Sequence, residues 1–101
     1  MGIPVGAGFD FFSAGRDSPT YRMRVDSLNR RAGVAVVSIA YSDRTVKQYS
    51  VVAEGVALYV RRDCEAPLDI KLQRIKKGGR GDLIADFEFF CDGVYEWRKV
   101  D

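Results

Sequence analysis

The chain has 101 residues, of which 47% are hydrophobic and 30% are charged. This length suits one domain and is too short for two, and the apolar fraction is high enough to fill a core rather than leave the chain disordered. Sixteen basic and fourteen acidic residues leave a formal charge of +2, a weaker excess than nucleic-acid-binding modules usually carry, so nucleic acid is not an expected partner.

Histidine is absent from the sequence, and with it the usual general base and the commonest transition-metal ligand. We therefore predict no catalytic residue, no metal site and no cofactor, and we do not expect an enzyme. No apolar stretch reaches the roughly 18 residues of a membrane span, and no export signal is recognisable, so we expect no membrane association. Cys64 and Cys91 are then expected to be free thiols, with a disulfide between them left open.

Residues 1–19 combine glycines and prolines with three phenylalanines, Phe9, Phe11 and Phe12. Glycine and proline disfavour regular structure, whereas exposed aromatic side chains are costly in water. We therefore predict an irregular N-terminal arm whose phenylalanines bind a partner protein. Packing of the arm on its own domain is the alternative, and the residues do not decide between the two.

The next segment, residues 20–32, combines two patterns. Residues 20–25 suit a strand, whereas Asp26 or Ser27 suits the cap of a short helical turn that places Val25 and Leu28 on one side. The fold is expected to contain at most a short helix, which would lie within residues 20–32, and residues 20–101 are expected to form a single β domain.

From Gly33 onward the pattern predicts strands. Residues 34–41 form an apolar, β-branched run, a turn is expected at 42–44, and residues 45–52 suit a second strand. A break at 53–55 precedes a third strand over 56–61.

The C-terminal half continues this pattern. Alternating residues predict strands over 68–73 and 83–91, separated by a charged loop over 76–82. Asp92-Gly93 between apolar runs is typical of a type I′ hairpin turn, with 94–100 as the returning strand. Antiparallel strands joined by short turns predict a mostly β fold, either a small sandwich or a partly open barrel.

The loop over 76–82 is the main candidate for a charged contact. Lys76, Lys77 and Arg80 stand near glycines and are able to contact a polyanion, because cations neutralise phosphate and glycines let backbone amides approach. Arg80-Gly81-Asp82 also spells the tripeptide that integrins recognise. A solvated loop tip explains the same residues without any partner.

Several segments, in order, resemble a small module of tail, baseplate or fibre-associated proteins of tailed bacteriophages. Gly6-Ala7-Gly8-Phe9 is similar to its N-terminal arm, and residues 24–31 are similar to its Arg-Val-x-x-Leu-x-x-Arg turn. Residues 54–60 are similar to its Glu-Gly-x-x-Val-Tyr-Val strand, and Trp97 stands in the last strand. The segment between Arg31 and Glu54 is longer than the corresponding segment of that module.

The resemblance implies a structural protein of the virion that binds neighbouring subunits as a homo- or hetero-oligomer. It also implies a location in the virion or the host cytoplasm. The alternatives are a small inhibitor or adaptor from a phage or mobile element that binds a host protein, and a weak nucleic-acid-binding β module.

Overall fold

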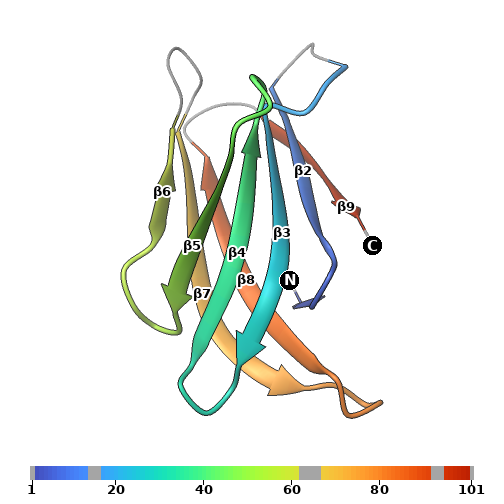
Figure 1. Ribbon diagram of the computed structural model, residues 1–101, viewed down its shortest axis with the longest axis vertical. Helices are drawn as coiled ribbons and strands as arrows, with labels where there is room; N and C mark the ends of the chain where they lie inside the picture. The colour runs from blue at the N-terminus through green and yellow to red at the C-terminus, as the bar shows by residue number, and fades with distance from the viewer. Residues whose placement is uncertain (1, 14–16, 62–66, 92–94, 101) are drawn as a thin grey trace.

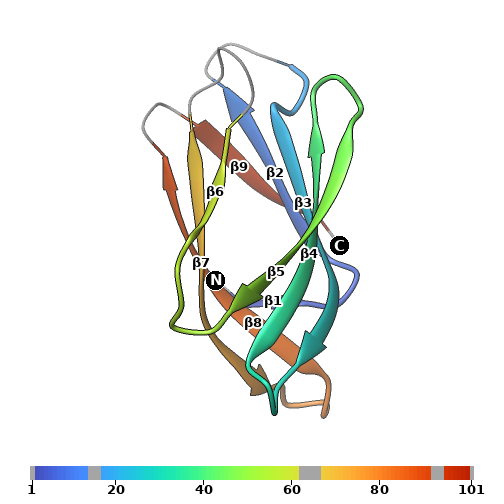
Figure 2. The same ribbon diagram turned by 60° about the vertical axis from the view of Figure 1, so that its left-hand side comes forward.

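The computed structural model describes residues 2–13, 17–61, 67–91 and 95–100, and within them it contains strands and turns but no helix. The strands are β1 (Gly2–Pro4), β2 (Gly8–Ser13), β3 (Tyr21–Asn29), β4 (Val34–Tyr41), β5 (Val46–Val52), β6 (Leu58–Val60), β7 (Leu68–Lys77), β8 (Leu83–Cys91) and β9 (Tyr95–Val100). They form a four-stranded sheet, β1-β8-β7-β6, and a five-stranded sheet, β5-β4-β3-β2-β9. The two antiparallel sheets face each other (Figures 1 and 2), which confirms the predicted sandwich.

Alternation of apolar and polar residues explains how the sheets enclose the core. Along β4, Ala35, Val37 and Ile39 are fully buried and the residues between them are half-buried, as expected for a strand with one face on the core. In β7 the alternation changes phase at a bulge between Leu72 and Arg74, after which Ile75 faces inward. The core lies between the inner faces of the two sheets.

The predicted irregular N-terminal arm is wrong. β1 pairs with β8 in one sheet, and β2 lies between β3 and β9 in the other. The glycines that suggested irregular backbone instead let the chain pass between the sheets. Gly6 has a φ of 89°, which glycine adopts readily. A Cβ on Gly8 would lie 1.7 Å from the carbonyl oxygen of Met23.

Of the two patterns in residues 20–32, the strand is the one that forms, because β3 extends from Tyr21 to Asn29. A bulge between Val25 and Ser27 shifts its register against β4. Because the bulge adds one residue, Val25 and Leu28 both pack against the core, although they are three positions apart. The spacing that suggested a helix therefore comes from the bulge.

The last two strands do not pair with each other, contrary to the hairpin predicted at Asp92-Gly93. Those two residues lie outside the described part of the chain, but the strands on either side of them belong to different sheets. β8 has β7 along one edge and β1 opposite residues 84–86 on the other. β9 instead pairs with β2, and the chain crosses from one sheet to the other after β8.

The central strands agree more closely with the sequence. β4 has the predicted bounds, the turn at 42–44 is present, and the break at 53–55 is present with a φ of 58° at Glu54. The third strand is shorter than expected, since β6 covers only Leu58–Val60, whereas β7 extends to Lys77. The charged loop is thereby reduced to a turn over 78–82.

Candidate binding surfaces

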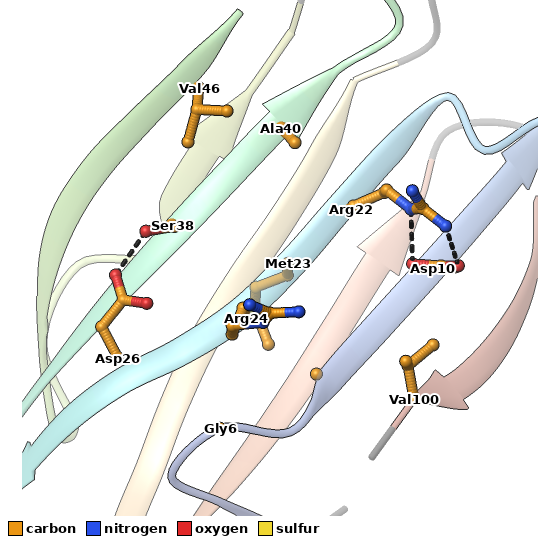
Figure 3. Close-up of a pocket in the computed structure, with 11 residues that line it drawn as sticks. Gly6, Asp10, Arg22, Met23, Arg24, Asp26, Ser38, Ala40, Val46 and Val100 are labelled. Atoms are coloured by element: carbon orange, nitrogen blue, oxygen red, sulfur yellow. Dashed lines mark hydrogen bonds and ion pairs between the residues drawn. The ribbon is translucent and has the colours of Figure 1, made fainter. Parts of the chain in front are cut away.

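A groove of about 440 Å³ lies on the outer face of the five-stranded sheet (Figure 3). It crosses β2, β3, β4 and β5 and ends at the segment that links β1 to β2. Its lining residues are Gly6, Gly8, Asp10, Arg22, Met23, Arg24, Asp26, Ser38, Ala40, Val46 and Val100.

An ion pair forms one wall of this groove. Asp10 on β2 lies directly opposite Arg22 on β3, with Arg22 Nε 3.2 Å from Asp10 Oδ1 and Nη2 3.3 Å from Oδ2 (Figure 3). The Arg22 side chain is 63% exposed, so the pair contributes little to stability. It does fix the orientation of both side chains.

The other wall is a hydrogen-bonded carboxylate. Asp26 accepts a hydrogen bond from the Ser38 hydroxyl and another, of 3.0 Å, from Gln48 Nε2. These side chains come from β3, β4 and β5, so the cluster links three adjacent strands. The Ser38 hydroxyl is held by a carboxylate and has no imidazole beside it, since the chain has no histidine. The arrangement therefore suits a structural clamp.

Arg24 stands between the two walls, opposite Gly8 on one side and Ser38 on the other. Its side chain is exposed, and it forms no hydrogen bond or ion pair with any residue that the structure describes. A guanidinium group presents a planar set of donors that fits a carboxylate. The groove is therefore able to bind an acidic side chain.

The three phenylalanines predicted to bind a partner are placed differently by the structure. Phe9 and Phe11 are 4% and 0% exposed, and both contact Phe89 edge-on, with ring centroids 5.2 and 5.0 Å away. Phe12, on the opposite side of the strand, is half-buried. Phe9 and Phe11 thus pack in their own domain, which is the alternative that the sequence left open.

The predicted polyanion residues do not gather into one free cluster. Lys76 Nζ lies 3.4 Å from Asp86 Oδ2, and Arg74 Nε donates to the same oxygen at 2.7 Å. The hydrogen bond from Arg74, and then Lys76, hold the pKa of Asp86 below its usual value near 3.8, although partial burial acts in the opposite direction. Lys77 and Arg80 are exposed at the end of this hairpin.

Exposed apolar side chains mark a second surface. Seven large hydrophobic residues are exposed among the described residues: Val5, Val46, Val52, Val56, Tyr59, Phe90 and Val100. Four of them lie on β5, on β6 or on the link between these strands, and Val56 in the link is 94% exposed. β5 and β6 are edge strands of their sheets and lie on the same side of the sandwich (Figures 1 and 2).

We call this side, residues 46–60, the β5–β6 edge. Sequence reasoning missed it because residues 45–52 and 56–61 read as ordinary strands. The sequence did contain a signal of an exposed apolar surface. Val46, Gln48, Ser50 and Val52 alternate with the inward-facing residues of β5, and two of these four outward residues are valines.

Comparison with known proteins finds no family model, no curated protein and no solved structure that matches the chain. The described residues contain no helix long and apolar enough to cross a membrane. Within the same residues, no three potential metal ligands of the Cys, Asp or Glu type lie together.

Proposed function

We propose that this chain is a structural, protein-binding domain of a larger assembly and that it holds neighbouring subunits through the β5–β6 edge. The observation that carries the proposal is the concentration of exposed apolar side chains there. Val46, Val52, Val56 and Tyr59 are between 52% and 94% exposed. Isolated exposed apolar residues are common, but a group of them on one side of a small domain is typical of an interface.

The backbone of the same edge supports this role. β5 and β6 are each paired on one side only, with β4 and β7. A strand with a free edge presents unpaired N–H and C=O groups that another chain is able to extend. Apolar side chains beside such an edge add specificity to the backbone hydrogen bonds.

The resemblance to phage tail modules supports a virion as the assembly. The segment over 54–60 carries part of that resemblance and lies within the β5–β6 edge. In that setting the neighbouring subunits are other virion proteins, and the chain is located in the virion or, before assembly, in the host cytoplasm.

One observation favours a second candidate, an adaptor or inhibitor that binds a host protein. Arg24 is an exposed guanidinium with no partner among the described residues, and it lies inside a groove. A host segment with an acidic residue would fit there. This candidate predicts binding that Arg24→Glu abolishes, whereas assembly through the β5–β6 edge is unaffected by that substitution.

Site-specific photo-crosslinking tests the proposed function. A photo-reactive phenylalanine analogue replaces Val56 in one variant and Arg80, an exposed residue of the turn between β7 and β8, in a matched control. We expect the Val56 variant to form a defined protein adduct in producing cells and in purified particles, and the Arg80 variant to form none. Equal labelling at both positions, or no adduct at Val56, would refute the proposal.

A further inference from the structure

We propose that β5 pairs with β5 of a second copy of this chain, around a two-fold axis at Tyr49, so that two five-stranded sheets join into one. This inference rests on the proposed function, because it names the partner of the β5–β6 edge. Three features of β5 support this pairing: the backbone groups that face its free edge, the order of its outward side chains and its single charge.

The hydrogen bonds at the two ends of β5 show which of its residues direct their backbone N–H and C=O groups toward β4. Tyr41 N donates to Thr45 O at 2.8 Å, and Ala53 N donates to Gly33 O at 2.7 Å. Opposite residues of an antiparallel pair alternate between bonded and non-bonded positions. With the register of β4 and β5, the N–H and C=O groups of Lys47, Tyr49 and Val51 therefore point to β4.

The residues between them, Val46, Gln48 and Ser50, point these groups toward the free edge. Val52 does so with its N–H, while its carbonyl accepts a hydrogen bond of 3.0 Å from Gly55 N. A second antiparallel strand is thus able to continue the ladder along nearly the whole of β5.

The outward side chains of β5 have a symmetric order. Val46, Gln48, Ser50 and Val52 read apolar, polar, polar, apolar, and the two valines are 61% and 52% exposed. Two-fold antiparallel pairing centred on Tyr49 places Val46 opposite Val52 of the second copy and Gln48 opposite Ser50 of the second copy. Both pairs join edge-facing residues, so the backbone hydrogen bonding permits the register that the side-chain match selects.

Other registers lose this match. Centring the axis on Gln48 places Val46 opposite the second copy's Ser50, and centring it on Ser50 places Gln48 opposite the second copy's Val52. Centring it on Lys47 brings two ammonium groups face to face, which is unfavourable. In the proposed register, Lys47 instead lies opposite the second copy's Val51.

The pairing closes on itself, because each copy uses the same edge and none of that edge is left for a third copy. Two strands of seven residues bury less area than a standard protein interface. We therefore expect a reversible dimer with a dissociation constant on the order of micromolar rather than nanomolar.

Charge substitutions at the two central outward positions test this register. Gln48→Lys with Ser50→Lys places lysine opposite lysine in both central pairs. Gln48→Lys with Ser50→Glu places lysine opposite glutamate. Both double variants keep a donor at position 48 for Asp26. Ser27→Lys, an exposed serine on the outer face of the central strand β3, is the control.

Sedimentation velocity from about 1 µM to about 1 mM measures the dimer. We expect the unmodified chain and the Ser27→Lys control to dimerise alike and the Lys/Lys variant to bind at least about tenfold more weakly. The Lys/Glu variant should bind at least as tightly as the unmodified chain, because the proposed register places each introduced lysine opposite a glutamate, whereas an axis on Gln48, Ser50 or Lys47 places like charges opposite each other.

Two results would overturn the self-pairing. If the Lys/Glu variant dissociates as much as the Lys/Lys variant, the register is wrong. If all forms are monomeric over the whole range, β5 does not pair with itself. In either case an adduct at Val56 with a different protein would still support the proposed function, so the two proposals fail separately.

Discussion

β2 and β5 belong to the same sheet, and each carries large apolar side chains, yet they have opposite environments. β2 has a strand on either side, and its Phe9 and Phe11 are buried in the core. β5 has a neighbour on one side only, and its Val46 and Val52 are exposed. An apolar strand residue is buried or exposed according to the sheet face that it occupies, since Val51 on the inner face of β5 is only 3% exposed. What distinguishes β5 from β2 is that a free backbone edge lies beside its exposed valines.

The largest effect is expected from truncating a core residue of β2. Phe11→Ala removes a fully buried ring that contacts Phe89, and such changes usually cost about 3–5 kcal/mol. Val46→Ala on β5 should change the free energy of unfolding by less than about 0.5 kcal/mol. Denaturant unfolding of the two variants, at a concentration where the chain is monomeric, measures the difference. Similar losses in both would break the comparison.

A backbone clash in β2 should have the next largest effect. Gly8→Ala places a Cβ against the carbonyl oxygen of Met23, and relief of this overlap must move the β2–β3 pair, at a cost of about 1–3 kcal/mol. The control Gly79→Ala meets no atom within 4 Å and should stay within about 0.5 kcal/mol of the unmodified chain. Thermal unfolding monitored by circular dichroism gives both values. An undisturbed Gly8→Ala variant would show that β2 does not approach β3 so closely.

A smaller effect is expected from the clamp that anchors β5 to its sheet. Asp26→Ala removes the acceptor of hydrogen bonds from Ser38 and Gln48, which should cost about 1 kcal/mol. Asp10→Ala removes an exposed ion pair with Arg22 and should cost less, at most about 0.5 kcal/mol. Equilibrium unfolding of both variants ranks them, and the reverse order would show that Asp26 does not hold β5.

The smallest effect concerns Asp86 on the four-stranded sheet. Its pKa is lowered in the folded state, first by Arg74, so its contribution to stability is present above the usual value near 3.8 and is lost as the pH falls through the folded pKa. Because Arg74 is 69% exposed, the contribution should not exceed about 1 kcal/mol. Asp86→Asn should flatten the pH dependence of unfolding below pH 4. An unchanged slope would show that the pair contributes nothing.

The sequence predicted those strands whose alternation is unbroken. β4 and β8 match their expected bounds because apolar residues recur along them at every second position. β3 was read in part as a helix because a bulge disturbs the alternation. β2 was missed because Gly8, needed for close contact with Met23, was taken as a sign of irregular structure.

The sequence predicted neither the groove nor the β5–β6 edge, because both surfaces depend on contacts between strands that are distant in the sequence. The partner of β9, the free edge of β5 and the position of Arg24 between two carboxylates all depend on which strands become neighbours. Neighbour choice is set by the packing of the whole sandwich and not by any local motif. The Asp92-Gly93 dipeptide illustrates this, since a local turn signal stands between strands that belong to different sheets.

Amide hydrogen exchange as a function of protein concentration tests the comparison of β2 with β5 most directly. We expect the β2 amides to be protected at every concentration, because β2 is paired on both sides. The amides of Val46, Gln48, Ser50 and Val52 should exchange fast in the monomer and become protected as the concentration rises, whereas that of Tyr49 stays protected throughout. Fast exchange along β2, or edge amides of β5 that stay unprotected in a dimer, would contradict the assignment of β2 to the core and β5 to the interface.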